Sequence, residues 1–301
     1  MNSGRDFGEL SALVSRSARR AALYVERVAL PTPSPTSTAV VTGASSGIGA
    51  DIARELADRG HGVTLVARRE ERLRELADEL AGRVRVEVIA CDVADSAARA
   101  GLFGEVDRRG LTADILVNNA GIGTMGSVTK TPVDDEIAQV RVNVEAVIDL
   151  TTRAVQQMVP RGRGAILNVG STAGYQPFPG QVGYAATKAF VNNYTQGLRG
   201  ELAGTGVTIA LLCPGPVRTE FVKSAGMDER EFANAFPKLL WKPSREVARA
   251  GVDALDHDRG TVIPGLPSQI TTRLFQFMPR RVLLPLVKNQ HPSLRRDRSA
   301  R

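Results

Sequence analysis

Short apolar stretches alternate with longer amphipathic stretches along residues 39–263 of this 301-residue chain. The short stretches are rich in Val, Ile, Leu and Ala, which is typical of buried strands. The longer ones carry apolar residues at helical spacing with charged residues between them, which is typical of helices with one buried face. Strands that are apolar throughout occur mainly in parallel sheets covered by helices on both faces. The pattern therefore predicts an α/β fold with a doubly wound parallel β-sheet in a single domain.

The predicted strands span residues 39–41, 61–67, 84–90, 114–117, 165–169, 207–212 and 261–263. The predicted helices span residues 48–59, 70–80, 96–108, 134–158, 182–203 and 244–255. Alternate prolines between residues 31 and 38 predict an extended linker before the first strand. We therefore divide the chain into an N-terminal extension with a Pro-rich linker (residues 1–36), the α/β domain (residues 37–265) and a basic, amphipathic C-terminal extension (residues 266–301).

A glycine-rich turn, residues 42–49 with the sequence TGASSGIG, separates the first predicted strand from the first predicted helix. Glycines let the backbone turn tightly and approach a pyrophosphate, and the N-terminus of the following helix presents free N–H groups to it. The spacing is G-x3-G-x-G rather than the common dinucleotide pattern G-x-G-x-x-G. A plain glycine turn is the alternative, but the order of strand, turn and helix favours a dinucleotide-binding loop.

Two arginines, Arg68 and Arg69, follow the second predicted strand. An acidic residue at this place would bind the ribose hydroxyls of NAD, whereas a basic residue suits the 2′-phosphate of NADP. The alternative is that both arginines simply begin the charged face of the next helix. We predict NADP as the preferred cofactor, with NAD as the second choice.

A tyrosine and a lysine four residues apart, Tyr184 and Lys188, share one face of the predicted helix 182–203. The usual pKa of a phenol is near 10, and a cation one turn away should lower it. Such a pair can move a proton to or from a carbonyl or hydroxyl oxygen. Because the same spacing also occurs on ordinary solvated helix faces, the pair alone is a weak signal, and the other motifs decide between the two interpretations.

Taken together, these motifs resemble those of the short-chain dehydrogenase/reductase family in its compact single-domain form. The resemblance covers residues 39 to about 264 and implies a Rossmann-type fold. It rests on the glycine-rich turn and on six further motifs that follow in the family's order. These motifs are Asp92, Asn118-Asn119-Ala120-Gly121, Asn143, Ser171, Tyr184-x3-Lys188 and Pro214-Gly215. Each is weak alone, but chance co-occurrence of all of them at these spacings is negligible.

The resemblance implies a catalytic role for four residues. Tyr184 would be the acid/base, and Ser171, thirteen residues earlier, would hydrogen-bond the substrate oxygen. Lys188 would bind the nicotinamide ribose and depress the phenol pKa, and Asn143 would hold a water that links Lys188 to solvent. One departure is that Gly170 stands where many relatives have a second serine. Because Ser171 is intact, we expect activity to be retained.

The resemblance also implies where a dinucleotide binds. Asp92 and Val93 would flank the adenine, and Asn118, Ala120 and Gly121 would line the ribose side and brace the sheet. The backbone around Val217 and the hydroxyl of Thr219 would hold the nicotinamide carboxamide. Together with Tyr184 and Lys188, the predicted cofactor-binding residues are Gly43, Ser45, Ser46, Gly47, Ile48, Gly49, Arg68, Arg69, Asp92, Val93, Asn119, Ala120, Gly121, Pro214, Gly215, Val217 and Thr219.

The predicted function is an NADP(H)-preferring oxidoreductase that interconverts a ketone or aldehyde with an alcohol. Residues 217–241 hold many large apolar side chains, which predict either a lid over a hydrophobic substrate or ordinary core packing. Three alternatives stay open: a non-catalytic NADP-binding sensor or scaffold, an NAD-dependent alcohol or hydroxysteroid-type dehydrogenase, and an epimerase or dehydratase of nucleotide sugars. Relatives commonly pair through the two long helices predicted here at 134–158 and 182–203, so we expect a homodimer or homotetramer.

The net charge of +7 comes from the end of the chain, because residues 270–301 hold eight Lys or Arg and one acidic residue. A nearly neutral body argues against nucleic acid binding, whereas a basic, apolar tail suits an anionic membrane surface. Pro279 and Pro285 are expected to break this tail into short helical pieces. Such a tail can lie on a membrane, cover the active site or pack against a partner subunit.

Other features of the composition narrow the protein class. No apolar run is long enough to span a membrane, and residues 1–30 lack the apolar core of a secretory signal. We therefore expect a cytoplasmic protein, with peripheral membrane contact as an addition. The three histidines show no metal-ligand spacing, so no metal is predicted, and Cys91 and Cys213 are expected to be reduced core residues. Residues 1–30 are expected to be helix-prone, and residues 290–301 disordered.

Overall fold

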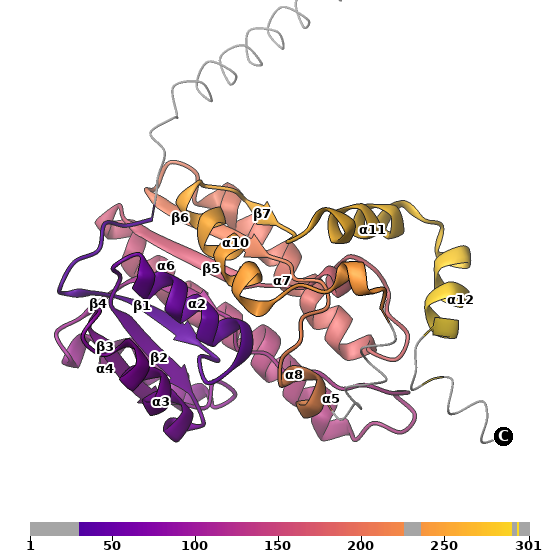
Figure 1. Ribbon diagram of the computed structural model, residues 1–301, viewed down its shortest axis with the longest axis horizontal. Coiled ribbons are helices and arrows are strands. Elements are labelled where there is room, and N and C mark those ends of the chain that lie inside the picture. Colours follow the sequence, from indigo (N-terminus) through magenta and orange to yellow (C-terminus); the bar gives the residue numbers. More distant parts are fainter. Residues whose placement is uncertain (1–29, 226–235, 291–293, 295–301) are drawn as a thin grey trace, which may run out of the picture.

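Seven parallel strands form one sheet in the order β3-β2-β1-β4-β5-β6-β7 (Figure 1). This computed structural model describes residues 30–225, 236–290 and 294. The strands are β1 (Ser37–Thr42), β2 (Val63–Ala67), β3 (Val86–Ala90), β4 (Thr112–Asn118), β5 (Gly164–Val169), β6 (Val207–Leu212) and β7 (Thr261–Val262). The direction in which strands are added reverses between β1 and β4. At such a reversal, connections leave to opposite sides and a crevice opens beyond the carboxyl ends of the strands.

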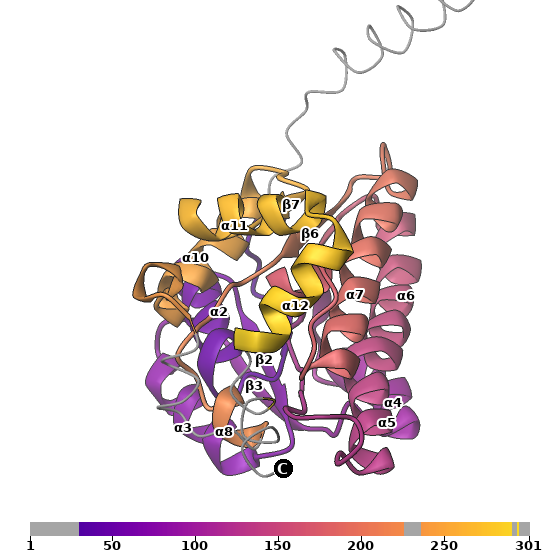
Figure 2. The ribbon, with the colours of Figure 1, turned by 90° about the vertical axis from the view of Figure 1, so that its right-hand side faces the viewer.

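Helices cover both faces of this sheet (Figures 1 and 2). The helices that flank it are α2 (Gly47–Asp58), α3 (Glu70–Leu80), α4 (Ser96–Arg108), α6 (Ala146–Met158), α7 (Val182–Glu201) and α10 (Ser244–Asp256). One core cluster joins the sheet to α2, α3 and α10, and a second joins it to α4, α6 and the end of α7. Val40 and Val41, neighbours on β1, are both 0% exposed and belong to different clusters. The strand is therefore buried on both sides, which explains why its sequence is apolar throughout.

The predicted doubly wound α/β fold in a single domain is confirmed. Each predicted strand and helix has a counterpart within a few residues, although β7 is only two residues long. Cys91 and Cys213 are free and buried, as expected. The expectations for residues 1–29 and for the last residues of the chain lie outside the described ranges. Among the helices that the structure describes, none is long and apolar enough to cross a membrane.

The uninterrupted helix predicted at residues 134–158 is wrong in its middle. Regular helix α5 (Val133–Val140) is followed by a π-helical turn (Arg141–Glu145) before α6 begins. Asn143 lies in this turn and is 0% exposed. Its side chain bonds to groups outside the helix, and this tertiary contact accompanies the wider turn. π-Turns of this kind are frequent at functional sites, and local sequence periodicity does not signal them.

The C-terminal segment forms two helices, α11 (Leu266–Phe277) and α12 (Arg280–Gln290). Pro279 separates them, as predicted, but the break predicted at Pro285 is wrong because this residue lies inside α12. Proline removes one backbone hydrogen bond. In α12 that loss is offset by the inward packing of Leu283 and Val287, which are 1% and 7% exposed.

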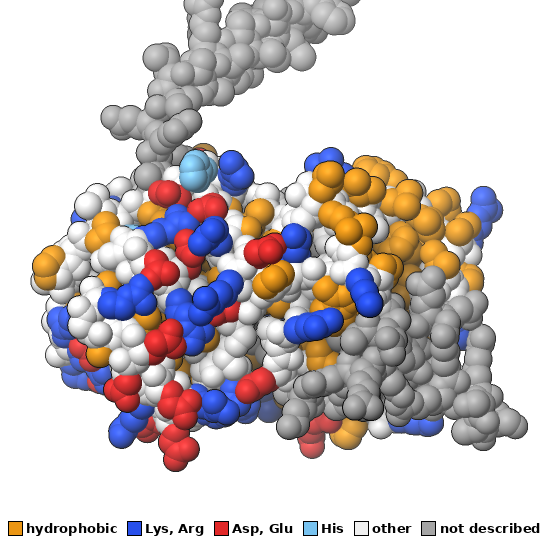
Figure 3. All heavy atoms as spheres, in the orientation of Figure 1, with side chains coloured by type: hydrophobic (Ala, Val, Ile, Leu, Met, Phe, Trp, Pro, Cys, Tyr) orange, Lys and Arg blue, Asp and Glu red, His pale blue; other side chains and the backbone are white. Residues whose placement is uncertain are grey.

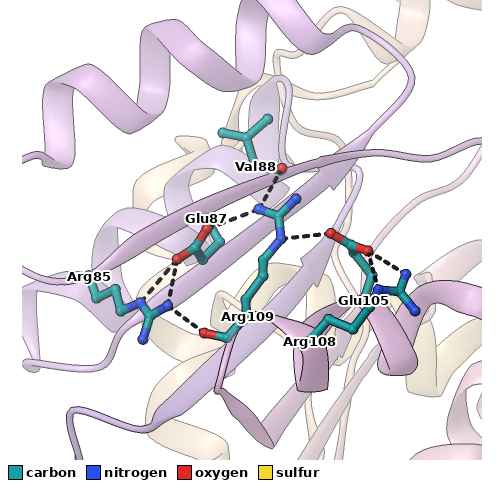
Figure 4. Close-up of polar contacts among 6 residues, drawn as sticks. All are labelled: Arg85, Glu87, Val88, Glu105, Arg108 and Arg109. Atoms are coloured by element: carbon teal, nitrogen blue, oxygen red, sulfur yellow. Dashed lines mark hydrogen bonds and ion pairs between the residues drawn. The ribbon is translucent and has the colours of Figure 1, made fainter.

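The edge strand β3 is fixed to α4 by a network of charged side chains (Figure 4). Arg109, just after α4, donates to Glu87 of β3 at 2.9 Å and to the backbone oxygen of Val88 at 3.1 Å. It also donates to Glu105 of α4 at 3.0 Å. Arg85 donates to the other oxygen of Glu87 at 3.0 Å. Charges along an edge strand also oppose pairing with another chain, so this network protects the open side of the sheet.

Buried amides and hydroxyls connect the centre of the sheet to α6 and α7. Asn118, the last residue of β4, donates to Asn168 of β5 and to Thr151 of α6, both at 2.9 Å. Asn168 in turn donates to Thr195 of α7 at 3.0 Å. These side chains are 0–3% exposed. The network holds the ends of β4 and β5 in register with the two helices, just before the segments that enter the crevice.

Replacing Asn168 by Ala should reveal the cost of breaking this network. The free energy of unfolding should fall by about 2–4 kcal/mol, because the substitution opens a cavity and removes the buried partners of Asn118 and Thr195. Urea denaturation of the two proteins measures it. Asn193→Ala, on the exposed side of α7, is the matched control and should cost less than about 0.5 kcal/mol. Equal losses in both variants would contradict the structural role of the network.

Candidate active site

A cavity of about 640 Å³ opens beyond the carboxyl ends of the central strands. The segments that follow β1, β2, β3, β4, β5 and β6 all contribute to its lining. Every predicted catalytic and cofactor-binding residue lines it except Gly49 and Asn143, and Asn118, expected to line the ribose side, is also outside the lining. The fold thus brings together side chains and backbone from positions 43 to 219 of the chain. The volume of the cavity is within the usual range for a small-molecule site.

Backbone conformation and close approach explain the glycines in the turn after β1 and in the first turn of α2. Gly43 has φ +67°, and a Cβ atom there would lie 2.8 Å from the Cα of Ala120. Gly47, the first residue of α2, has φ +56°. A Cβ on Gly49 would lie 2.4 Å from the backbone oxygen of Gly43, so Gly49 packs behind the turn instead of lining the cavity. A glycine cradle that ends in a helix N-terminus fits the pyrophosphate of a dinucleotide.

Hydroxyl and guanidinium donors gather beside this cradle. Arg69 donates to the hydroxyls of Ser45 and Ser46 at 3.2 and 3.1 Å, and to the carboxylate of Glu220 at 2.9 Å. Arg68 is exposed and lines the cavity next to them. The two arginines therefore do more than begin the charged face of α3. Their donor set suits a phosphate at this end of the cavity.

The Tyr184–Lys188 pair lies at the opposite end, where α7 meets the end of β5. Both residues line the cavity, together with Ser171. The Nζ atom of Lys188 lies 5.9 Å from the centre of the Tyr184 ring and donates to the backbone oxygen of Val169 at 2.8 Å. The Ser171 hydroxyl accepts a hydrogen bond from the N–H of Ala173 at 3.1 Å, which caps the short 3-10 helix Thr172–Tyr175. A phenol, a hydroxyl and an ammonium thus converge on one wall.

A family model described as short chain dehydrogenase matches residues 37–230. The chain belongs to this family. It is accordingly an oxidoreductase of alcohol and carbonyl groups, and the resemblance inferred from the motifs is confirmed.

Named relatives cover most of the chain. It is 39% identical over 245 residues to sulfoacetaldehyde reductase 2 of Chromohalobacter salexigens, an alignment that covers 80% of this chain and 94% of that protein. It is 39% identical over 195 residues to the NADP-dependent 3-hydroxy acid dehydrogenase YdfG of Salmonella typhi, covering 64% of this chain and 78% of the relative. Among solved structures, a short-chain dehydrogenase from Sphingobium yanoikuyae in complex with NADPH is 31% identical, with a TM-score of 0.70 over 81% of this chain and 97% of that one.

Burial governs the charge states of the pair in this family member. It raises the pKa of Tyr184 to about 12, although a hydrogen bond with Ser171 acts in the opposite direction. It lowers the pKa of Lys188 to about 8. The lowered phenol pKa predicted from the sequence is therefore wrong for this structure, because removal from water disfavours phenolate more strongly than its surroundings favour it. At neutral pH the phenol is protonated and can donate.

Asn143 acts as a connector between three segments. Its Nδ2 donates to the backbone oxygen of Ile122 at 2.8 Å and to Thr187 of α7 at 3.0 Å. Its Oδ1 accepts from the N–H of Ile122 at 3.0 Å. The π-turn is thereby tied to the segment after β4 and to the middle of the Tyr184–Lys188 interval. The role of Asn143 in holding a water remains a prediction. The three hydrogen bonds fix the position of its side chain.

Asn192 explains the glycine that precedes Ser171. Its Nδ2 donates to the backbone oxygen of Ser171 at 3.1 Å, and its Oδ1 accepts from the thiol of Cys213 at 3.4 Å. A Cβ on Gly170 would lie 2.1 Å from that Oδ1. A second serine, as in many relatives, would require the Asn192 side chain to shift. Asn192 was not among the residues predicted from the sequence, although its position four residues after Lys188 places it on the same face of α7.

Apolar side chains from the C-terminal half close the cavity. The lining includes Phe221, Phe236, Leu240, Phe275 of α11 and Val287 of α12. Of the three fates expected for the tail, covering the site is the one that these helices show. Phe221, Phe236 and Leu240 come from the segment expected to be a lid or core packing, of which residues 226–235 lie outside the described ranges. No sequence motif marks Phe275 or Val287, because their position depends on how α11 and α12 fold back.

The low pKa of Lys188 predicts a pH-dependent contribution to stability. Its pKa is about 8 in the folded protein and about 10.4 in an unfolded chain. Between these values the unfolded chain binds more protons, so the contribution of Lys188 to the free energy of unfolding rises with pH. Below pH 8 the side chain is charged in both states, and the folded state bears the whole desolvation cost.

The stability of the wild type minus that of Lys188→Met should therefore rise by about 2–3 kcal/mol between pH 7 and pH 10. Urea denaturation of both proteins at half-unit pH steps gives this difference. The titrations of cysteines and tyrosines occur in both proteins and therefore cancel. Lys238→Met, at an exposed lysine, should give a difference that stays flat. A flat difference for Lys188→Met as well would contradict the burial effect.

The contact between Gly170 and Asn192 predicts a non-additive pair of substitutions. Gly170→Ser should lower the free energy of unfolding by about 1–3 kcal/mol, because its Cβ overlaps the Asn192 amide. When Asn192→Ala is present, that overlap is gone, so the double variant should lose less than the sum of the single variants. Gly197→Ser, at a position where nothing lies within 4 Å, controls for the substitution itself. Strict additivity in chemical denaturation would show that the two residues do not collide.

Proposed function

We propose that this chain is an NADP(H)-preferring oxidoreductase that interconverts a ketone or aldehyde with an alcohol on a hydrophobic substrate. One observation carries the proposal. A half-buried phenol that stays protonated at neutral pH, Tyr184, lies beside Ser171 in the same cavity as the glycine cradle. A proton donor and a dinucleotide site that share one cavity are the two requirements for reduction of a carbonyl by hydride transfer.

Each polar residue of the wall has a defined task in this proposal. Negative charge develops on the carbonyl oxygen during reduction, and the Ser171 hydroxyl stabilises it by a hydrogen bond. Tyr184 transfers its proton to that oxygen, and in the reverse direction it receives the proton from the alcohol. Lys188 orients the nicotinamide ribose, and with a pKa of about 8 it can also exchange a proton. A bound nicotinamide supplies or accepts the hydride.

The cofactor preference follows from the donors at the far end of the cavity. Arg68, Arg69 and the hydroxyl of Ser45 would hold a 2′-phosphate, while the glycine cradle of Gly43 and Gly47 would hold the pyrophosphate. The names of the Salmonella relative and of the Sphingobium complex, NADP-dependent and NADPH-bound, support this preference. The ion pair between Arg69 and Glu220 would have to rearrange to free the guanidinium for the phosphate.

The substrate is proposed to be apolar around its carbonyl group. The names of two relatives point to small acids, a sulfonate aldehyde and a 3-hydroxy acid. Among the described residues, however, the cations that line the cavity are Arg68 and Arg69 at the dinucleotide end and Lys188. The ring of Phe221 lies 5.3 Å from that of Tyr184, and the rest of the apolar lining includes Met125, Phe178, Leu240 and Phe275. They suit an acyl chain or an aromatic ketone better than an anion.

A homodimer or homotetramer is also proposed. Apolar side chains on α5 and α6 are unusually exposed, with Val133 at 75%, Ile137 at 45%, Val140 at 41% and Ile148 at 38%. Val182, at the start of α7, is 53% exposed. A patch of this kind supports pairing of subunits through these helices. The location is proposed to be cytoplasmic, in keeping with two free, buried cysteines.

Tyr184→Phe tests the proton-donor role. Reduction of an aryl or long-chain alkyl ketone by NADPH should fall by about 10²–10⁴-fold in kcat, because the proton donor is lost, while the Kd for NADPH changes less than about threefold. Steady-state absorbance at 340 nm and fluorescence titration of NADPH measure the two quantities. Tyr194→Phe, elsewhere on α7 and outside the cavity lining, should leave both unchanged. Equal turnover in wild type and Tyr184→Phe would refute the assignment.

Arg68→Asp tests the cofactor preference. It removes a cation from the phosphate end and adds a charge that repels a 2′-phosphate. The Kd for NADPH should rise by about 10–100-fold, and the Kd for NADH should stay within about threefold. Arg72→Asp changes the charge equally on the exposed part of α3, outside the cavity lining, and should alter neither. If both cofactors weakened to the same extent, the NAD-dependent alternative would replace our proposal.

A further inference from the structure

The two faces of α11 differ in character. Ser268 and Thr272 point inward and are 4% and 5% exposed, and with Phe275 they line the cavity. The outer face carries large apolar side chains at spacings of four, four and three residues. These are Leu266, Ile270, Leu274 and Phe277, which are 57–83% exposed. In a helix this spacing aligns them in one stripe, on the side away from the cavity.

Helix α12 also has buried apolar residues, with exposed apolar residues on both flanks of them. Leu283 and Val287 are buried, whereas Val282 is 53% exposed and Leu284 and Leu286 are each 38% exposed. We call the seven exposed apolar side chains of α11 and α12 the C-terminal apolar surface. Figure 3 shows apolar side chains gathered over the part of the molecule where Figure 1 places these helices. A contiguous apolar patch of this kind on a folded domain marks a site of interaction.

The helices that carry this surface have basic side chains and no acidic ones. Between residues 266 and 290 the chain has four cationic residues and no Asp or Glu. The cations are Arg273, Arg280, Arg281 and Lys288. The rest of the described surface differs, because there arginines alternate with acidic partners, as around Glu87 and Glu105. An apolar stripe with an all-basic rim is complementary to a layer that is apolar inside and anionic outside.

We propose that the C-terminal apolar surface and its basic rim form a docking site for an anionic lipid membrane. Apolar side chains would enter the boundary between headgroups and acyl chains, and the arginines would contact lipid phosphates. A second copy of this chain is disfavoured as the occupant, because its own all-basic rim would face the first. The inner side of the same helices lines the cavity through Thr271, Thr272, Phe275 and Val287. Docking would therefore place the lipid layer on the outer side of the two helices whose inner side lines the cavity.

Vesicle flotation of the full-length protein tests the proposal without any turnover. The probes are vesicles of equal parts phosphatidylglycerol and phosphatidylcholine, and vesicles of phosphatidylcholine alone. We expect the bound-to-free ratio on the anionic vesicles to exceed that on the neutral ones by at least tenfold. Because flotation does not depend on catalysis or on NADPH, its outcome is independent of the proposed function.

Two double variants separate the apolar and basic contributions. Arg280→Gln/Arg281→Gln should lower the bound-to-free ratio by about 25-fold, since each cation near an anionic surface contributes roughly fivefold. Leu274→Ser/Phe277→Ser should lower it by about tenfold or more. Arg72→Gln/Arg74→Gln on α3 makes the same charge change, and Val128→Ser removes an apolar side chain that is 52% exposed. Both controls should bind as the wild type does.

Several results would overturn the proposal. The first is failure of the wild type to float with anionic vesicles. The second is equal flotation of the wild type and both double variants, which would assign binding to another part of the chain. The third is a wild-type oligomer that Leu274→Ser/Phe277→Ser converts to monomers, seen by light scattering, without vesicle binding by either protein. That result would make this surface a subunit interface.

Discussion

The reversal of strand order between β1 and β4 is the constraint on which the rest of this molecule depends. Parallel strands place all their carboxyl ends at one edge of the sheet, and the reversal sends the connections on either side away from each other. The glycine cradle after β1, the arginines after β2 and Ser171 after β5 consequently border one cavity. The buried network of Asn118 and Asn168 fixes the ends of β4 and β5, on one side of that reversal. The site is thus a consequence of how the sheet is wound.

Helix α7 organises the chemistry at this edge. Four of its side chains act there in different ways. Tyr184 and Lys188 line the cavity, Thr187 bonds to Asn143, and Asn192 holds the backbone of Ser171. Because all four lie on one face of α7, on which Thr187, Lys188 and Asn192 are buried, a shift of the helix would move the whole constellation together. Burial of that face also sets the charge states, since it raises the pKa of Tyr184 and lowers that of Lys188. A phenol that is neutral at pH 7 can donate its proton, as we propose for Tyr184.

Sequence patterns were sufficient for the fold and for the choice of candidate residues. Apolar strands and amphipathic helices have periods set by backbone geometry, so β1 to β7 could be located without a structure. The motif residues could be found because each is needed at a fixed place relative to a strand end or a helix turn. Three features could not be predicted from the sequence: the π-turn at Asn143, the continuity of α12 through Pro285 and the raised pKa of Tyr184. Each depends on tertiary contacts or burial, which local sequence does not encode. The same holds for Phe275 and Val287, which reach the cavity only because α11 and α12 fold back over it.

Transfer of a labelled hydride tests the central claim most directly. NADPH carrying deuterium at the transferable C4 position of the nicotinamide would be incubated with the protein and a panel of aryl and long-chain alkyl ketones. The products would be analysed by mass spectrometry and NMR. We predict an alcohol with one deuterium on the former carbonyl carbon and a hydroxyl proton from solvent, because the hydride comes from the cofactor and the proton passes through Tyr184. An alcohol without deuterium at that carbon, or no reduction of any ketone in the panel, would contradict it.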